Sequence, residues 1–198
     1  HFFGIVNRIS QGSRTDKFSI YKASIVPHVW LLTQKTQNRI FMDTTVPDIL
    51  EKVFHGFTII KNLAGTYEPR TYCVQYRETD WDFACRLMEE EGVFYYFVHE
   101  DGMDKLLLGD DPGHHRSCPN KSEFVYYVQE GAGGGFDPNP IMTWYTDHRL
   151  QTGKMTLWDH NFQLPQRNFS KEQPSRFSAG GNADLEVYDF PGGYAKKY

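Results

Sequence analysis

The chain has 198 residues and a formal net charge of -4, and aromatic side chains make up 16% of it. A chain of this length suits one ordinary domain or two small ones, and its aromatic content suits a β-rich core or a broad interface. The charge argues against nucleic acid as the main partner, because no basic surplus is available to neutralise phosphates, and the longest apolar run, residues 92–98, is too short for a transmembrane segment.

The first predicted element is a β-hairpin. Residues 2–9 and 18–26 are rich in β-forming side chains and flank a turn-like segment at 11–16. Two shorter segments, residues 29–32 and 39–42, add either short strands or one helical turn. The chain also begins at His1 with strand-like residues and without a secretory signal pattern, so we expect a piece of a longer protein.

Two helices are predicted from their capping residues. Thr45 and Thr79 each supply a hydroxyl cap, with Asp48 and Asp82 three positions later. Apolar residues follow each cap at helical spacing. Gly92 is placed to end the second helix as its C′ residue.

Strands account for most of the remaining pattern. Residues 72–76 form a short strand between the helices, and residues 93–98 and 105–108 form a hairpin after them. The glycine-rich stretch at 131–140 is the clearest flexible break. Further strand-like segments lie at 124–128, 141–145, 155–158 and 184–190. The predicted fold class is α+β and β-rich, with more strand than helix.

The three cysteines, Cys73, Cys85 and Cys118, are odd in number and include no Cys-x-x-Cys pair. They do not resemble the disulfide framework of a small secreted protein, so cytosolic synthesis is the expectation. Cys85 falls on the apolar face of the second predicted helix. There it is expected to pack as a small hydrophobic residue and not to act as a nucleophile.

The acidic run of Glu89, Glu90 and Glu91 is a weak candidate for acid–base chemistry. Neighbouring residues on a helix point in different directions, so they do not form a facing carboxylate pair. Acids near a helix C-terminus are also unfavourable with the helix dipole. We therefore expect them to be solvated or ion-paired, with Arg86 or with a cation from elsewhere.

His114, His115 and Cys118 lie close together and are all possible zinc ligands. A structural zinc site needs four ligands, usually in two spaced pairs, and here only Asp110 and Asp111 add to the set. The segment is interpreted as an ordinary exposed loop. The sequence also has no Gly-x-Ser-x-Gly elbow, and Gly133, Gly134 and Gly135 are followed by no Lys-Ser or Lys-Thr pair.

These patterns predict no catalytic, cofactor-binding or metal-ligating residue and no cofactor. A binding or assembly protein is favoured over an enzyme on this ground. An alternative stays open, in which the middle of the chain hosts a hydrolase. Its candidate residues are Glu89, Glu90, Glu91, His114 and His115.

Residues 70–97 closely resemble the VgrG family, the spike proteins of type VI secretion systems. The block reads RTYCVQYRETDWDF at 70–83 and RLMEEEGVFYYF at 86–97. The resemblance covers most of the chain and is weakest at 120–140. Other segments that fall where the family has its own versions are residues 1–6, 30–33, 39–41, 46–53, 153–159 and 183–192.

The resemblance implies a hub like that of contractile phage tails, with two barrel-like domains and an inserted α/β domain. Residues 1–43 are then the end of the first hub barrel. Residues 44–140 are the inserted α/β domain, and residues 141–198 return into the second hub barrel, which is incomplete.

The function that the resemblance implies is structural and non-enzymatic. Three copies would form a homotrimer with pseudo-six-fold symmetry, which docks on the hexameric Hcp tube and works with baseplate, effector and adaptor proteins. Such a spike is assembled in the bacterial cytoplasm and delivered to the extracellular space or a target cell on firing. An alternative of the same kind is a hub of a phage tail or another contractile injection particle.

Overall fold

A computed structural model describes residues 1–118, 121, 123–124, 126, 141–178 and 180–195. The chain divides into two compact units, His1–Ser122 and Glu123–Tyr198. The predicted flexible break at 131–140 and most of the strand predicted at 124–128 lie outside the described residues. Each unit is therefore taken by itself.

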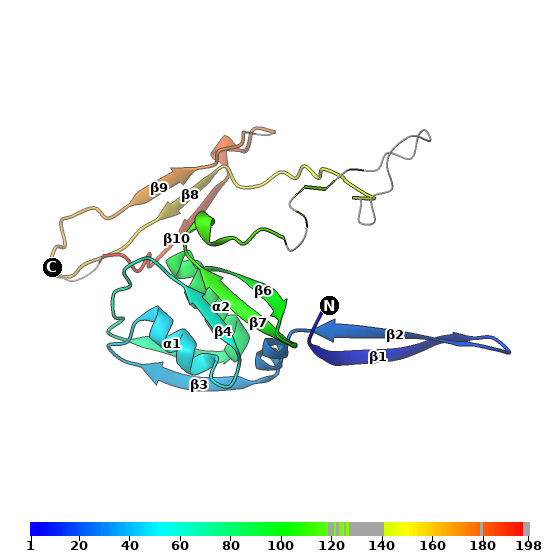
Figure 1. The fold of residues 1–198 in the computed structure, drawn as a ribbon. Coiled ribbons are helices and arrows are strands. Elements are labelled where there is room, and N and C mark those ends of the chain that lie inside the picture. The colour runs from blue at the N-terminus through cyan, green and yellow to red at the C-terminus, as the bar shows by residue number, and fades with distance from the viewer. Residues whose placement is uncertain (119–120, 122, 125, 127–140, 179, 196–198) are drawn as a thin grey trace. The chain divides into compact units, whose positions relative to one another are not determined.

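The first unit contains the predicted hairpin, both predicted helices and the second predicted hairpin (Figure 1). The segment predicted at 29–32 as a short strand or a helical turn is a 3-10 helix, and the one at 39–42 belongs to a longer strand. In chain order the elements are β1 (Ile5–Arg14), β2 (Ser19–Val26), η1 (His28–Gln34), β3 (Thr36–Phe41), α1 (Val46–Val53), β4 (Ile59–Asn62), β5 (Cys73–Thr79), α2 (Asp80–Glu91), β6 (Phe94–Glu100), β7 (Met103–Gly109) and η2 (Pro112–His114).

The strands of the first unit form three small sheets. β1 pairs only with β2, β3 pairs with β5, and β4, β7 and β6 form a three-stranded sheet in that order. β4 runs parallel to β7 through the pair Ile59–Leu106, whereas β6 and β7 form the antiparallel hairpin. Strand β4 is absent from the sequence prediction, because its parallel partner lies far along the chain.

Both helices begin at the predicted caps. The Thr45 hydroxyl oxygen accepts a hydrogen bond from the Asp48 amide at 3.3 Å, and the Thr79 hydroxyl oxygen accepts one from the Asp82 amide at 3.0 Å. Gly92 ends α2 in the left-handed conformation with φ of 71°, which costs a glycine little. The capping residues therefore fix where both helices start and where α2 stops.

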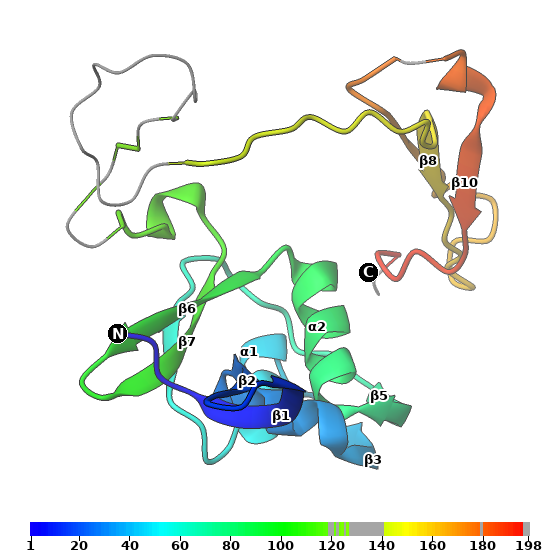
Figure 2. The ribbon, with the colours of Figure 1, turned by 90° about the vertical axis from the view of Figure 1, so that its right-hand side faces the viewer.

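The hydrophobic core of the first unit lies between its helices. α1 and α2 pack against each other, α2 also contacts η1, and the two α-helices lie next to each other in Figures 1 and 2. Phe83 of α2 is fully buried and stacks on Phe41 with ring centroids 5.7 Å apart. The other buried apolar side chains of this core include Leu32, Val46, Ile49, Leu50, Val53, Phe54, Ala84, Leu87, Leu106 and Leu108.

The second unit is a small sheet with irregular connections. Its elements are β8 (Lys154–Leu157), β9 (Lys171–Pro174), η3 (Asn182–Asp184) and β10 (Glu186–Asp189), and the strand order is β10-β8-β9. β10 runs parallel to β8 and β9 antiparallel to it. β8 and β10 confirm the strands predicted at 155–158 and 184–190. The mostly polar β9 was not predicted.

The prediction of a strand at 141–145 is wrong. Ile141 forms only an isolated bridge to Tyr126, and residues 142–145 have no regular structure. A β-forming sequence becomes a strand only beside a paired edge. The described chain is thus β-rich with few helices, as predicted, and its described sheets include no closed barrel. No helix in the described part of the chain is long and apolar enough to cross a membrane.

Candidate assembly surface

The β1–β2 hairpin has one apolar face that is open to solvent. Directly opposite residues of an antiparallel pair share a face, and a bulge after Val6 keeps Val6 on the same face as Ile9. The exposed fractions are 58% for Val6, 69% for Ile9, 61% for Tyr21 and 59% for Ile25. We call these four residues the hairpin face. The register pairs that define it are Val6–Ile25, Ile9–Ala23 and Gln11–Tyr21.

The opposite face of the hairpin is mostly polar and carries basic side chains. Arg8 pairs with Ser24 and Ser10 with Lys22, and these side chains line a shallow depression of about 390 Å³. The hairpin carries four basic side chains against one acidic one: Arg8, Arg14, Lys17 and Lys22 against Asp16. The ribbon therefore has the alternation of a strand pair whose apolar side is normally covered.

Both outer edges of the hairpin are unpaired within the described residues. A two-stranded ribbon is marginal in water without packing against other elements, and open edges are templates for strand addition. In Figure 1 the hairpin extends away from the helices of its unit. Its face and its edges are therefore available to a partner.

The base of the hairpin is fastened to the β6–β7 hairpin. The Phe3 amide donates to Nδ1 of His99 at 3.1 Å, and the His28 amide, just after β2, donates to Oδ2 of Asp104 at 2.9 Å. The His28 ring also contacts Oδ1 of Asp104. Burial of Asp104 raises its pKa, but the hydrogen bonds from the His28 ring and amide outweigh it and hold the pKa below its ordinary value. The β1–β2 hairpin is thus held to the rest of its unit at its base only.

A buried polar network ties the start of α2 to two strands. Nη2 of Arg39 lies 2.6 Å from Oδ1 of Asp80, and Nε of Arg39 donates to Oε1 of Gln75 at 2.7 Å. Nε2 of Gln75 completes the triangle with a 2.9 Å bond to Asp80. Asp80 is only 3% exposed, so the network satisfies a buried charge and has a structural role.

Two of the three acids at the end of α2 are ion-paired and Glu89 is exposed to solvent, in line with the expectation that the run is solvated or ion-paired. Arg70 contacts Glu90 and lies 2.7 Å from Glu91, and Nη1 of Arg86 lies 3.3 Å from Glu90. Arg86 also pairs with Glu78 at 2.7 Å. Two guanidinium groups therefore offset acids that the helix dipole disfavours, and the sequence had indicated one of them, Arg86.

His114, His115 and Cys118 do not converge. The His115 ring stacks on Phe94 with centroids 4.3 Å apart, and the His114 carbonyl accepts a bond from the Tyr96 hydroxyl at 2.9 Å. Nδ1 of His114 lies 3.3 Å from Asp110 without forming a hydrogen bond among the described residues. The described residues contain no group of three His, Cys, Asp or Glu side chains placed to hold a metal ion.

Asp110 accepts hydrogen bonds from the loop that follows β4. Its carboxylate accepts bonds from the amides of Ala64 at 2.9 Å and Gly65 at 2.7 Å and from the Tyr67 hydroxyl at 2.9 Å. The two amides lead the effects that lower the pKa of Asp110. Burial, and then the same carboxylate, raise the pKa of Tyr67 to about 12. Asp110 is thus a structural latch between this loop and β7.

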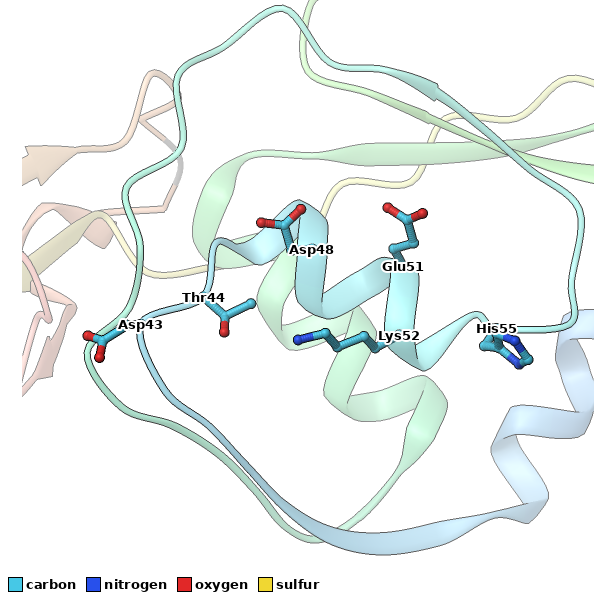
Figure 3. A pocket seen from close by; sticks show the side chains of 6 residues that line it. All are labelled: Asp43, Thr44, Asp48, Glu51, Lys52 and His55. Atoms are coloured by element: carbon cyan, nitrogen blue, oxygen red, sulfur yellow. The ribbon is translucent and has the colours of Figure 1, made fainter.

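An open depression lies on the outer side of α1. It has a volume of about 510 Å³ and is lined by Asp43, Thr44, Asp48, Glu51, Lys52 and His55. Figure 3 shows these side chains spread along α1 and the segments on either side of it, without converging on one point. Asp48 accepts a bond from the Thr45 hydroxyl at 2.6 Å, and Glu51 pairs with Lys61 at 2.6 Å. This surface has no geometry for catalysis.

Cys85 is a partly buried thiol. It packs against the core cluster, and burial leads the effects that raise its pKa to about 11. The thiol is therefore protonated at neutral pH and unsuited to nucleophilic attack. The feature that the sequence analysis did not identify as a site is the hairpin face, although its alternation was visible in residues 5–9 and 20–26.

Comparison with known proteins gives a consistent family. The family model for the phage tail baseplate hub (GPD) matches residues 1–198. The type VI secretion system spike protein VgrG1b of Pseudomonas aeruginosa is 38% identical over 200 residues, which cover 99% of this chain and 26% of that protein. The chain thus spans about a quarter of the length of this relative.

Solved structures agree with this match. An Escherichia coli component of the type VI secretion system, described as similar to the T4 bacteriophage tail proteins gp27 and gp5, superposes with a TM-score of 0.56 and 26% identity over 64% of this chain and 36% of that one. A tail protein from Neisseria meningitidis shares the fold with a TM-score of 0.54 at 14% identity, covering 93% of this chain and 53% of that one. The chain belongs to the phage tail baseplate hub family and is similar, over nearly its whole length, to the hub region of VgrG spike proteins.

Proposed function

We propose that the chain is a structural hub of a type VI secretion spike that assembles as a homotrimer and docks on a hexameric Hcp-type tube. The observation that carries this proposal is the family match along residues 1–198, in a chain whose first hairpin leaves an apolar face uncovered. An exposed apolar face on a paired ribbon is typical of a surface made for another protein. Baseplate, effector and adaptor proteins would then be further partners.

The proposed domain arrangement follows from the same family. Residues 1–43 would belong to the first hub barrel, residues 44–140 to an inserted α/β domain, and residues 141–198 to the second hub barrel. The open edges of β1, β2 and β10 support this arrangement, because a barrel needs neighbours on both edges of each strand. The spike would be assembled in the bacterial cytoplasm and leave the cell on firing.

A non-enzymatic role fits the contacts of the residues named for a hydrolase. Glu90 and Glu91 are held by guanidinium groups, and His115 is stacked on Phe94. These residues therefore serve packing and charge balance. We propose no reaction for them.

The second candidate is a hub of a phage tail or another contractile injection particle. The description of the matching family and the likeness to a tail protein from Neisseria meningitidis favour it. Both candidates share the mechanism, a symmetric ring of hub chains on a tube, and differ in the tube protein that is bound.

Binding to purified tubes tests the proposal. The chain is immobilised and exposed to Hcp hexamers and, in parallel, to hexamers of a phage tail tube protein at the same concentration. We expect saturable binding to Hcp and weaker binding to the phage tube. Preference for the phage tube would support the second candidate, and binding to neither would contradict both.

A further inference from the structure

Two histidines hold the base of the β1–β2 hairpin, one beside each strand. The segment that leads into β1 is held by His99 of β6, because Nδ1 of its ring accepts a hydrogen bond from the Phe3 amide at 3.1 Å. The segment that follows β2 is held by His28, whose amide donates to Asp104 of β7 at 2.9 Å and whose ring contacts the same carboxylate. Histidine is the side chain that ordinarily changes its charge between about pH 5 and pH 8, so a change of pH in this range acts on both attachments.

The attachment before β1 requires a neutral ring at His99. A backbone amide can only donate, so Nδ1 of His99 must carry a lone pair and the ring proton must lie on Nε2. A protonated imidazole carries a proton on both nitrogens and has no acceptor. Protonation of His99 therefore removes the acceptor of the Phe3 amide and places two donors opposite each other.

The attachment after β2 has the opposite requirement. Nδ1 of the His28 ring contacts Oδ1 of Asp104, and an ionised carboxylate can only accept, so this nitrogen carries a proton in either charge state of the ring. A positive charge on His28 adds an ion pair to the contact, and the side chain of Asp104 is buried. The same fall in pH therefore weakens the attachment before β1 and strengthens the one after β2.

The charged groups around His99 favour its protonated form on the side of β7. Asp104 is directly opposite His99 in the register of β6 and β7, and directly opposite residues share a face. On the N-terminal segment the titratable groups are the amino group and the ring of His1, and this ring lies 6.5 Å from that of Phe3. The other charged side chains at this end of the β6–β7 hairpin pair with one another: Glu100, Asp101, Lys105 and Arg116. A protonated His99 is therefore attracted to Asp104, whereas the Phe3 amide offers it no acceptor.

The residues that join the hairpin to its base differ in the same direction. Gly4 separates Phe3 from the start of β1, and a glycine gives the backbone the freedom to bend at that point. Pro27 separates the end of β2 from His28, and its ring fixes the backbone there with φ of -59°. The attachment that weakens on acidification thus has the flexible link, and the attachment that strengthens has the rigid one.

We propose that the base of the hairpin is a pH-sensitive hinge, in which protonation of His99 releases the segment before β1 while His28 and Asp104 hold the segment after β2. The strands β1 and β2 stay paired, because their register does not involve His99. Release gives the hairpin face freedom to move relative to the packed part of its unit. The hinge belongs to the single chain, so it does not depend on the proposed homotrimer.

Nuclear magnetic resonance of the isotope-labelled chain tests the hinge. The chain is titrated from pH 8 to pH 5, and the ring signals of His99 are followed together with the amide signals of Phe3 and His28. We expect the amide proton of Phe3 to lose its hydrogen-bonded shift with the same midpoint as the His99 ring. The heteronuclear Overhauser effect, which reports fast backbone motion, should fall for Phe3 and stay unchanged for His28.

Replacement of the titrating acceptor supplies the decisive variant. In His99→Asn the amide oxygen takes the place of Nδ1 and can accept from the Phe3 amide, but it does not titrate. The Phe3 amide signal should then be independent of pH between 8 and 5. The matched control is His55→Asn, which replaces an exposed histidine of the same unit beside α1. It should leave the joint titration of Phe3 and His99 as it is in the parent chain.

The titration of the parent chain is enough to overturn the inference. A Phe3 amide signal that stays constant while the His99 ring titrates would do so, as would a His99 ring that stays neutral down to pH 5. A Phe3 signal that still titrates in His99→Asn would assign the change to His1 and also overturn it. Equal loss of order at Phe3 and His28 would show that the base opens as a whole, without the proposed hinge.

Discussion

The helical core of the first unit and the β1–β2 hairpin have similar side-chain patterns but opposite surroundings. In the core, α1 and α2 each present an apolar face that is covered by the rest of the unit, and the buried charge of Asp80 is paired. In the hairpin, an equally regular apolar face stays exposed. The comparison teaches that regular apolar patterning alone does not bury a face: the core face is covered within the unit, whereas the hairpin face is not covered by any described residue.

Truncation of a core aromatic side chain should give the largest difference between the two regions. Phe83→Ala removes a fully buried ring that stacks on Phe41 and should lower the free energy of unfolding by about 3–5 kcal/mol. Ile9→Ala on the hairpin face should change the free energy of unfolding by less than about 0.5 kcal/mol at concentrations where the chain is monomeric, because its side chain is exposed there. Urea unfolding followed by circular dichroism measures both. Equal losses would contradict the division of roles.

Loss of a buried ion-pair partner should give the second-largest decrease in the free energy of unfolding. Arg39→Met leaves Asp80 with Gln75 as its remaining side-chain donor and should cost about 2 kcal/mol, less than for a fully buried pair because Arg39 is partly exposed. Arg8→Met on the hairpin is the matched control and should have little effect. If Arg39→Met lowers the free energy of unfolding as little as Arg8→Met does, the polar network around Asp80 does not stabilise the fold.

Removal of a helix cap should have a smaller effect. Thr79→Ala removes the oxygen that accepts from the Asp82 amide and should lower the free energy of unfolding by about 1 kcal/mol. Thr79→Ser keeps that oxygen and should recover most of the loss. A Ser variant as unstable as the Ala variant would show that packing of the threonine methyl group, and not the cap, is responsible.

Within the first unit, the acid dependence of stability should arise in the packed part and not in the hairpin. Because the amides of Ala64 and Gly65 lead in lowering the pKa of Asp110, its contribution is present above the unfolded pKa of about 3.9 and is lost as pH falls through the lower folded value. Asp110→Asn should therefore reduce the loss of stability between about pH 5 and pH 3.

The control for this titration is Asp16→Asn at the tip of the hairpin. It should leave the acid dependence unchanged, because Asp16 has no hydrogen bond or ion pair among the described residues. The measurement is the urea midpoint at a series of pH values. If the urea midpoint of Asp110→Asn changes with pH in parallel with that of the parent chain, the hydrogen bonds of the Asp110 carboxylate do not stabilise the fold.

Local signals predicted much of this fold. Neighbouring residues carry the signals for six of the elements. The caps at Thr45 and Thr79 predict α1 and α2, and the alternation of side chains in the two hairpins predicts β1, β2, β6 and β7. β4 did not, because its partner β7 lies more than forty residues away. The segment at 141–145 has β-forming side chains but no paired edge, so its composition misled the prediction.

The candidate surface was predicted only in part. The sequence showed the hairpin, and its resemblance to VgrG proteins pointed to an assembly role, but exposure cannot be read from alternation. Val6 and Leu50 are both apolar residues in regular elements, yet one is 58% exposed and the other 1%. Only the three-dimensional arrangement shows which apolar face the unit itself covers.

The central proposal is that the chain assembles as a homotrimer and that the hairpin face contributes to the contact between copies. Light scattering should give three times the chain mass of 23.1 kDa for the parent protein. The double variant Val6→Asp/Ile25→Asp should give the mass of a single chain with an unchanged far-ultraviolet circular dichroism spectrum. A parent chain that stays monomeric at high concentration, or a double variant that keeps the parent's mass, would contradict the account.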